Sequence, residues 1–203
     1  IFKKSNKNGH GFSKFYKKKL DNLKEKKINI LEIGSFSGAS AAAFIKYFPN
    51  SNVFCFDINI SNFEYKSKKM HVFGIDINNK KKVKKVLNYI SKIHNVEKFD
   101  FIIDDGSHNL SDILNCIKIF FKYVKNKGLY IIEDFKYPNY YNYNNDIDHI
   151  FIDKMLENLN NKKVFESKIL TKEDQIRLIN SVKEIKIFKG NLKDSDICFI
   201  TKY

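Results

Sequence analysis

The chain has 203 residues, 43% of them hydrophobic and 15% aromatic, which is enough for one sizeable core and too little for two comfortable domains. No run of eighteen apolar residues occurs, and the charged residues are spread along the whole length, so we expect a soluble protein without a membrane span. Two prolines and eight glycines exclude collagen-like chains and disordered chains rich in these residues.

The net charge of +14 comes from 37 basic and 23 acidic residues, and its simplest interpretation is a solvated lysine surface. Arg177 is the only arginine. Because arginine is the side chain best suited to forked recognition of phosphate and guanine, its near absence disfavours nucleic acid as a partner. The charge also suits an anionic substrate or surface, so by itself it does not decide the function.

The cysteines Cys55, Cys116 and Cys198 each lie within an apolar run, and no pair has the C-x-x-C spacing of a zinc or redox motif. We therefore expect three buried thiols in a reducing compartment, with the cytoplasm as the default location. The sequence opens with Ile1, so a removed targeting peptide stays open at this point.

The predicted elements alternate along the chain. An amphipathic helix over residues 12–23 precedes the first strand, and we expect residues 1–27 to form an N-terminal helical segment that contributes to the pocket of the domain formed by residues 28–203. Apolar runs predict strands at residues 28–33, 53–56, 71–75, 99–103 and 129–132. Helical patterns lie between these strands, at residues 39–48, 80–93 and 111–124. This alternation favours a parallel sheet covered on both faces.

The last third of the chain changes character. A loop rich in tyrosine and asparagine at residues 136–145 is followed by a helical pattern at residues 150–159. Strand-like runs at residues 182–188 and 197–201 predict a terminal antiparallel hairpin. The expected fold is therefore α/β: a Rossmann-like, doubly wound, mostly parallel sheet of seven strands with a C-terminal antiparallel hairpin.

Acidic residues cluster where the predicted strands end, which is where open α/β sheets bind ligands. They are Glu32, Asp57, Asp76, Asp104, Asp105, Glu133 and Asp134. The loop from Gly34 to Gly38 reads G-x-x-x-G rather than the G-x-G-x-x-G of dinucleotide sites. Such a loop suits a nucleoside with a charged amino-acid tail, and Asp57 is placed to hold ribose hydroxyls.

Four segments carry a resemblance to a known family: residues 30–38 (ILEIGSFSG), 54–57 (FCFD), 99–108 (FDFIIDDGSH) and 128–134 (GLYIIED). Together they resemble the class I S-adenosylmethionine-dependent methyltransferases, over most of the chain. The pair DDGSH and YIIED is similar to the magnesium-dependent sugar O-methyltransferases of macrolide biosynthesis, of the macrocin and mycinamicin type. Residues 7–16 resemble the segment bearing Lys, His and Tyr that precedes the first strand in that group.

The resemblance implies S-adenosylmethionine and a magnesium ion as cofactors. The residues implied to surround S-adenosylmethionine are Glu32, Gly34, Ser35, Gly38, Ser40, Asp57, Ile58, Asp76 and Asp104. Asp105, Glu133 and Asp134 are the implied metal ligands, and oxygen ligands of this kind suit a hard cation. A bound cation lowers the pKa of a sugar hydroxyl, and His108, three residues after Asp105, is the implied general base.

The acceptor is expected to be a small molecule or a glycan that carries hydroxyl groups. Tyr137, Tyr140 and Tyr141 follow the expected metal ligands, and aromatic faces pack well on sugar rings, so they are candidate substrate residues together with His10. A sticky surface loop or a contact in a homo-oligomer explains the same tyrosines equally well.

Several simpler interpretations stay open. Asp104 and Asp105 are also typical of a strand-to-helix turn, Glu133 and Asp134 of solvated loop carboxylates, and His108 of a helix cap. If those held together, the acids would repel one another with no compensating cation nearby. The alternative functions are an RNA methyltransferase and a catalytically silent S-adenosylmethionine-binding protein. Motifs for adenine amino or cytosine C5 methylation are absent from the sequence, and every expected acid is present.

Overall fold

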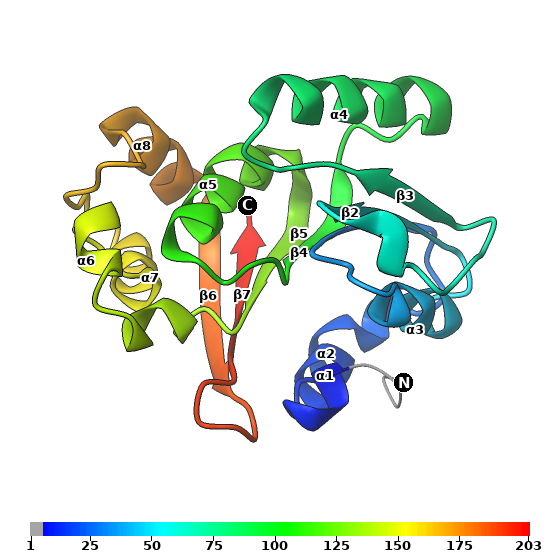
Figure 1. Cartoon of the computed structure of the whole chain (residues 1–203), viewed down its shortest axis with the longest axis horizontal. Coiled ribbons are helices and arrows are strands. Elements are labelled where there is room, and N and C mark those ends of the chain that lie inside the picture. The colour runs from blue at the N-terminus through cyan, green and yellow to red at the C-terminus, as the bar shows by residue number, and fades with distance from the viewer. Residues whose placement is uncertain (1–5) are drawn as a thin grey trace.

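Seven strands form one sheet in the order β3-β2-β1-β4-β5-β7-β6 in the computed structural model, which describes residues 6–203 (Figure 1). The strands are β1 (Ile28–Ile33), β2 (Ser51–Asp57), β3 (Met70–Gly74), β4 (Phe99–Asp104), β5 (Val124–Glu133), β6 (Val182–Lys189) and β7 (Asp196–Lys202). The first five run parallel, and β7 pairs antiparallel with both β5 and β6. The predicted fold class is confirmed.

Helices cover both faces of this sheet. They are α1 (Asn6–Gly9), α2 (Ser13–Leu20), α3 (Ala39–Tyr47), α4 (Lys80–His94), α5 (Leu110–Phe120), α6 (Asn144–Ile147), α7 (Ile152–Asn160) and α8 (Lys172–Ser181). Apolar residues of α2 and α3 form one core cluster with the sheet, and those of α4, α5, α7 and α8 form the other. Figure 1 accordingly shows α3 and α4 on opposite sides of β2 and β3.

The central strands are apolar on both faces because each face meets helices. In β1, Ile28 and Ile30 belong to the cluster under α2 and α3, whereas Leu31 and Ile33 belong to the cluster under α4 and α5. Successive side chains of a strand point to opposite faces, which explains why apolar residues occur at both odd and even positions of this strand. The three cysteines are buried and unpaired, as predicted.

The boundary between α5 and β5 differs from the predicted one. The helix ends at Phe120, a single 3-10 turn (Phe121–Tyr123) follows, and Val124 already pairs with Phe99 as the first residue of β5. The register then shifts between Phe99 and Phe101, and Lys127 has a positive φ of 62°. This irregularity lets β5 start before its apolar run, which begins at Leu129.

Helix α8 was not predicted, because its buried positions include the polar residues Asp174 and Gln175 beside Leu178. Its first turn is instead fixed by a capping box in which Thr171 and Asp174 exchange hydrogen bonds. None of the helices within residues 6–203 is long and apolar enough to cross a membrane.

The strand order reverses between β1 and β4, which are direct neighbours. At such a switch point the loops that follow the two strands leave toward opposite faces of the sheet and open a crevice at its carboxyl edge. The fold therefore brings the loops after β1 and β4 to one place, beside the end of β5.

Candidate active site

A cavity of about 440 Å³ lies at the carboxyl ends of β1 to β4. Its wall contains five of the predicted cofactor residues, together with Asp105 and His108. Those five are Gly34, Asp57, Ile58, Asp76 and Asp104. Among the described lining residues there is no lysine or arginine, although the chain as a whole is strongly basic. The charged residues that line the cavity are therefore acidic, although the net charge of the protein is positive.

The loop after β1 lies directly against the loop after β4. Gly34 has a positive φ of 82°, and a Cβ atom at this position would overlap the backbone carbonyl of Asp105. Gly38, with φ of 80°, is pressed in the same way against the ring of Phe63. Only glycine combines this backbone conformation with such close approach, which explains the G-x-x-x-G spacing.

Asp57 fastens this loop to the end of β2. One oxygen of its carboxylate accepts the backbone N–H of Phe36 at 2.7 Å, and the other accepts the N–H of Asn59 at 2.9 Å. Phe36 itself has a positive φ of 46°, which is unusual for an aromatic residue. Each carboxylate oxygen of Asp57 keeps a further lone pair, so the side chain remains able to bind a ligand.

The remaining predicted cofactor residues, Glu32, Ser35, Gly38 and Ser40, do not line the cavity. Glu32 is fully buried and accepts a hydrogen bond from Ser40, while its second oxygen, Oε2, has no hydrogen-bond partner among the described residues. Burial raises the pKa of Glu32, and the neighbouring positive charge of Lys7 opposes that rise. These four residues therefore lie on the buried side of the loop and not on the side that faces the cavity.

Asp104, the last residue of β4, is almost completely buried although it borders the cavity. Burial raises the pKa of Asp104 to about 7, and hydrogen bonds from Cys116 and Tyr130 oppose the rise. The hydroxyl of Tyr130 lies 3.4 Å from its carboxylate.

Lys7 of α1 is fully buried against the acids at the strand ends. Its ammonium lies 2.7 Å from Asp105 Oδ2, 2.7 Å from Glu133 Oε1 and 3.8 Å from Glu32 Oε1. Burial alone lowers the pKa of a lysine, but the three carboxylates outweigh it and raise the pKa of Lys7 well above its usual value. From the sequence we assumed that the acids at the ends of the two strands have no compensating cation in the protein. That assumption is wrong, because Lys7 is such a cation.

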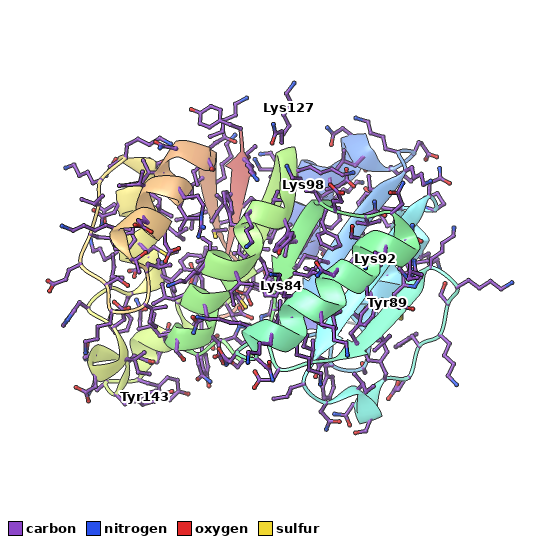
Figure 2. The ribbon with its side chains drawn as sticks, turned by 90° about the horizontal axis from the view of Figure 1, so that it is seen from above. Lys84, Tyr89, Lys92, Lys98, Lys127 and Tyr143 are labelled. Carbon is purple, nitrogen blue, oxygen red and sulfur yellow. The ribbon has the colours of Figure 1, made fainter. Side chains whose placement is uncertain are left out.

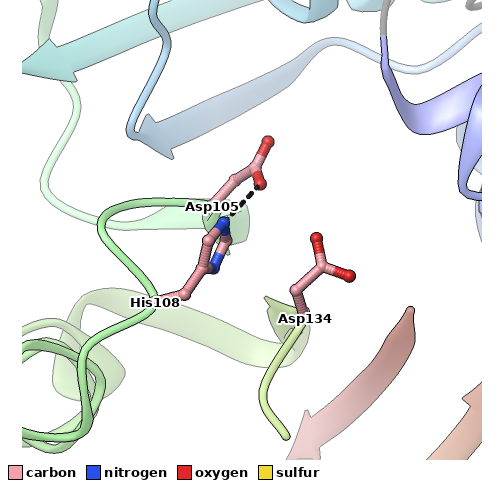
Figure 3. A group of neighbouring side chains, drawn as sticks. All are labelled: Asp105, His108 and Asp134. Atoms are coloured by element: carbon pink, nitrogen blue, oxygen red, sulfur yellow. Dashed lines mark ion pairs between the residues drawn. The ribbon is translucent and has the colours of Figure 1, made fainter. Parts of the chain in front are cut away.

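Asp105, His108 and Asp134 form a compact cluster at the ends of β4 and β5 (Figure 3). One ligand atom from each lies within 4.8 Å of the others, and His108 Nε2 is 3.8 Å from Asp105 Oδ1. His108 and Asp134 have positive φ values of 56° and 50°. The left-handed backbone at two of three members is the kind of local strain that concentrates at functional sites.

Asp134 also faces the N-terminal segment, since its carboxylate lies 3.2 Å from Nδ1 of His10. Burial raises the pKa of Asp134, and His10 and His108 oppose the rise. Two of the three predicted metal ligands, Asp105 and Asp134, thus share one cluster, with His108 as its third member.

The third predicted ligand, Glu133, is placed differently. Its Oε1 atom accepts hydrogen bonds from both Lys7 and the hydroxyl of Tyr16. Burial raises the pKa of Glu133, and the nearby Asp105 raises it further. Its role as a metal ligand stays a prediction, because a carboxylate bound in this way still has its second oxygen.

The tyrosine loop approaches the cluster through one residue. The ring of Tyr137 lies 6.1 Å from that of His108, and its hydroxyl is 2.7 Å from the hydroxyl of Tyr141. Tyr140 is turned elsewhere: its hydroxyl donates to the backbone oxygen of Lys193, in the turn between β6 and β7. Of the predicted substrate residues, His10 therefore contacts Asp134 and Tyr137 contacts His108.

Sequence reasoning missed the roles of Lys7 and Tyr16. Tyr16 belongs both to the family-like segment of residues 7–16 and to the apolar stripe of its helix, where it is buried with Phe12 and Leu20, and neither signal predicted its hydrogen bond to Glu133. Lys7 lies in the segment of residues 7–16 that carries the family resemblance, but the resemblance assigned it no contact with the acids.

The fold is that of solved methyltransferase structures, although no family model matches the sequence. The chain is 30% identical over 132 residues to L-olivosyl-oleandolide 3-O-methyltransferase of Streptomyces antibioticus, covering 62% of this chain and 32% of that protein. It is 26% identical over 133 residues to mycinamicin VI 2''-O-methyltransferase of Micromonospora griseorubida, covering 62% and 31%.

The structure of the MycE methyltransferase from the mycinamycin biosynthetic pathway, in complex with Mg, SAH and mycinamycin VI, superposes with a TM-score of 0.71 at 17% identity. The match covers 94% of this chain and 49% of MycE. The chain thus spans about a third of the length of the curated relatives it matches. These comparisons confirm the resemblance to sugar O-methyltransferases that the sequence predicts.

Proposed function

We propose that this chain transfers a methyl group from S-adenosylmethionine to a hydroxyl of a sugar or another polyhydroxylated small molecule. The observation that carries the proposal is the acidic cavity, which shares Asp105 and His108 with the cluster completed by Asp134. A nucleoside whose tail carries positive charge is complementary to such a wall. A dinucleotide is not, because its phosphates would meet aspartates and no basic side chain among the described lining residues.

The cavity residues suit the parts of S-adenosylmethionine. Asp57 would hold the ribose hydroxyls with the lone pairs that its backbone contacts leave free. Asp76 and Ile58 would border the adenine, Ile58 offering an exposed apolar face. The unpaired Oε2 of Glu32 marks a buried acceptor behind the loop that would surround the amino-acid part.

The donor set of the cluster also fits a hard divalent cation such as Mg²⁺, which prefers carboxylate oxygens. Asp105 and Asp134 would hold it, with Glu133 as the further predicted ligand. When bound, S-adenosylmethionine supplies an electrophilic methyl group and the metal ion acidifies a hydroxyl.

The chain's own residues would then move the proton. His108 lies beside Asp105, and we assign it the role of general base that accepts the proton of the acceptor hydroxyl. Asp105 would orient its ring, and Tyr137 would pack against both the ring and the substrate. Lys7 holds Asp105 and Glu133 from the buried side, which fixes the geometry of the acids before any ligand arrives.

An RNA acceptor fits this site less well. The lysine surface would attract a phosphodiester backbone, but the cavity wall and the cluster beside it carry carboxylates, which would repel it. A catalytically silent binding protein is the other alternative, and it would give no methyl transfer to any acceptor.

Calorimetric titration of S-adenosylmethionine and S-adenosylhomocysteine, with and without Mg²⁺, tests the cofactor. We expect binding to the wild type and a loss of at least about tenfold in affinity in Asp57→Ala, since both ribose contacts depend on this carboxylate. Glu97→Ala, which removes an exposed acid outside the cavity, should bind like the wild type. Absence of binding by the wild type in every condition would refute the proposal.

The assigned base has its own test. In a screen of sugar acceptors with Mg²⁺ present, His108→Ala should lower the rate of methyl transfer by about 10²- to 10⁴-fold. The affinity for S-adenosylhomocysteine should change little, and the exposed His149→Ala should behave like the wild type. Wild-type rates in His108→Ala would remove His108 from the mechanism.

A further inference from the structure

A second pocket, of about 310 Å³, lies beside the tyrosine loop and contains none of the residues of the cofactor cavity or the acidic cluster. Its walls come from Asn139, Tyr141, Asn142 and Asn145 of the loop and from Phe151 and Asp153 at the start of α7. We propose that this pocket is a saccharide subsite, which binds a neutral sugar ring linked to the ring that is methylated. The inference rests on the proposed function and names its acceptor as an oligosaccharide or glycoside.

The pocket presents polar groups that the protein itself leaves unused. Oδ1 of Asp153 is buried without a hydrogen-bond partner among the described residues, and the exposed side-chain amides of Asn139 and Asn142 have none in that part of the chain either. The other carboxylate oxygen of Asp153, Oδ2, is not enclosed in this way, so it can accept a hydrogen bond from a ligand hydroxyl in the pocket. Amides and a carboxylate together offer both donors and acceptors, which is what neighbouring sugar hydroxyls require.

The pocket also has an aromatic wall of the kind that packs on the C–H face of a sugar. Tyr141 is 38% exposed and Phe151 is partly buried against the core. Asn145 donates from its side chain to the backbone oxygen of Asn142 at 3.0 Å, which fixes the shape of the loop between them. Tyr143, by contrast, projects from the edge of the molecule near α6 (Figure 2) and is not part of the pocket.

The charges in the pocket favour a neutral ligand. Lys154 lines it, but its ammonium lies 2.8 Å from the carboxylate of Glu157 on the same helix. The remaining charge is the carboxylate of Asp153, which would repel an anionic sugar such as a uronic acid or a sugar phosphate.

Two tyrosines connect the pocket with the acidic cluster. Tyr141 lines the pocket, its hydroxyl is bonded to that of Tyr137, and the ring of Tyr137 lies against His108. A sugar held at His108 and a second ring in the pocket would therefore contact the two members of one tyrosine pair. This arrangement selects acceptors with at least two linked rings.

The test compares oligosaccharides with their own monosaccharides by saturation-transfer NMR and calorimetry, in the presence of S-adenosylhomocysteine. The probes are lactose, maltotriose and chitotriose against galactose, glucose and N-acetylglucosamine. We expect at least one oligosaccharide to bind the wild type about tenfold more tightly than its monosaccharide. The variant Asn142→Ala with Asp153→Asn should lose this advantage while its affinity for the monosaccharide stays within about twofold.

Two further variants keep the outcome readable. Asn142→Ala alone changes only an exposed side chain, so it reports on the pocket even if the double variant unfolds, and it should lose part of the advantage. Asn88→Ala removes an exposed asparagine of α4 and should bind every probe like the wild type. Circular dichroism confirms that each variant is folded.

An oligosaccharide advantage that is absent from the wild type, or that survives in the double variant, would overturn the subsite. A change of oligomeric state in that variant, without a change in saccharide binding, would instead identify the loop as a contact between copies. Because the binding measurement needs no methyl transfer, it stays interpretable if the proposed function fails. Failure of cofactor binding with the oligosaccharide advantage intact would leave a saccharide-binding protein.

Discussion

Lys7 is the residue on which the arrangement of the candidate site depends most. Its ammonium joins α1 to the ends of β4 and β5 through Asp105 and Glu133, and all three side chains are almost or fully withdrawn from water. A buried ion pair adds little net stability when both partners are present, but removing one partner leaves an uncompensated buried charge.

We predict that Lys7→Met lowers the free energy of unfolding by about 3–5 kcal/mol, because Asp105 and Glu133 would then face each other without a counter-ion. Urea denaturation at neutral pH measures the change. The control is Lys18→Met, at an exposed position of α2, which should stay within about 0.5 kcal/mol of the wild type. Adding Glu133→Gln to Lys7→Met should restore part of the loss, and wild-type stability in Lys7→Met would contradict this account.

Residue by residue, the acids were predictable and their partner was not. Asp57, Asp104 and Asp134 were found because parallel strands end at one edge of a sheet, so position in the strand pattern alone brings their side chains together. The resemblance of residues 7–16 placed Lys7 before the first strand, but its burial against Asp105 and Glu133 depends on where a short N-terminal helix docks, which is a tertiary contact.

At the scale of elements, the contact between the loops after β1 and β4 limits what the pocket tolerates. We predict that Gly34→Ala destabilises the protein by more than about 3 kcal/mol, since it adds a positive φ for a residue with a Cβ to an overlap with the backbone of Asp105. Gly106→Ala is a matched control on the facing loop, where a Cβ would make ordinary contacts at 3.6 and 3.9 Å. Equal thermal stability of the two variants would show that the loops separate easily.

A pair of histidines, one in β3 and one at the end of α4, makes the stability of the protein depend on pH. The rings of His71 and His94 are 4.1 Å apart and both contact Phe54, and Nε2 of His71 is buried without a partner among the described residues. Burial lowers the pKa of His71, and the proximity of His94 lowers it further. The unfolded chain then binds more protons than the native one at pH values below about 6.5, so stability falls as the solution is acidified through that range.

We predict that His71→Phe, which keeps an aromatic ring on Phe54, reduces this acid-dependent loss. The difference should be no more than about 1 kcal/mol, because the ring retains some contact with solvent, which screens the charge. Thermal melts of both proteins at pH 7 and pH 5 measure it. Parallel pH profiles for wild type and variant would assign the loss to other groups.

The elements themselves divide into those with and without a sequence signal. The seven strands were predictable, the central ones because both faces of the sheet are covered and the strands are rich in apolar residues, and the edge strand β6 because apolar and polar residues alternate along it. Helix α8 has a weak apolar face and is recognisable only by the capping pair Thr171 and Asp174. The early start of β5 depends on a register shift in its pairing with β4. The pattern of apolar residues in the sequence does not predict that shift.

For the whole molecule, the charge is divided between two regions. Lysines such as Lys84, Lys92 and Lys98 lie on the face that Figure 2 shows, where α4 also exposes Tyr89, whereas the cofactor cavity is lined by acids. The net charge of +14 therefore describes the outer surface and not the site. This division agrees with a solvated lysine surface, the simplest interpretation of the composition.

Three segments far apart in the chain meet beside the acidic cluster, and this closure could not be predicted from sequence. The turn between β6 and β7 is joined to the N-terminal segment by the N–H of Asn191, which donates to the backbone oxygen of His10 at 2.8 Å. It is joined to the tyrosine loop by the hydroxyl of Tyr140, which donates to the backbone oxygen of Lys193 at 3.4 Å. Each contact is between loops, so no repeat or periodicity encodes it.

We predict that Gly190→Ala weakens acceptor binding without affecting the cofactor. Gly190 needs no unusual φ, but a Cβ there would overlap the backbone oxygen of His10, so the turn and the N-terminal segment must move apart. His10 contacts Asp134, and neither it nor the turn lines the cofactor cavity, so the KM for the acceptor should rise about three- to tenfold. The affinity for S-adenosylhomocysteine should stay within about twofold. Gly9→Ala, next to His10 but with open space around its Cβ, is the control, and an unchanged acceptor KM in Gly190→Ala would show that the closure does not shape the acceptor site.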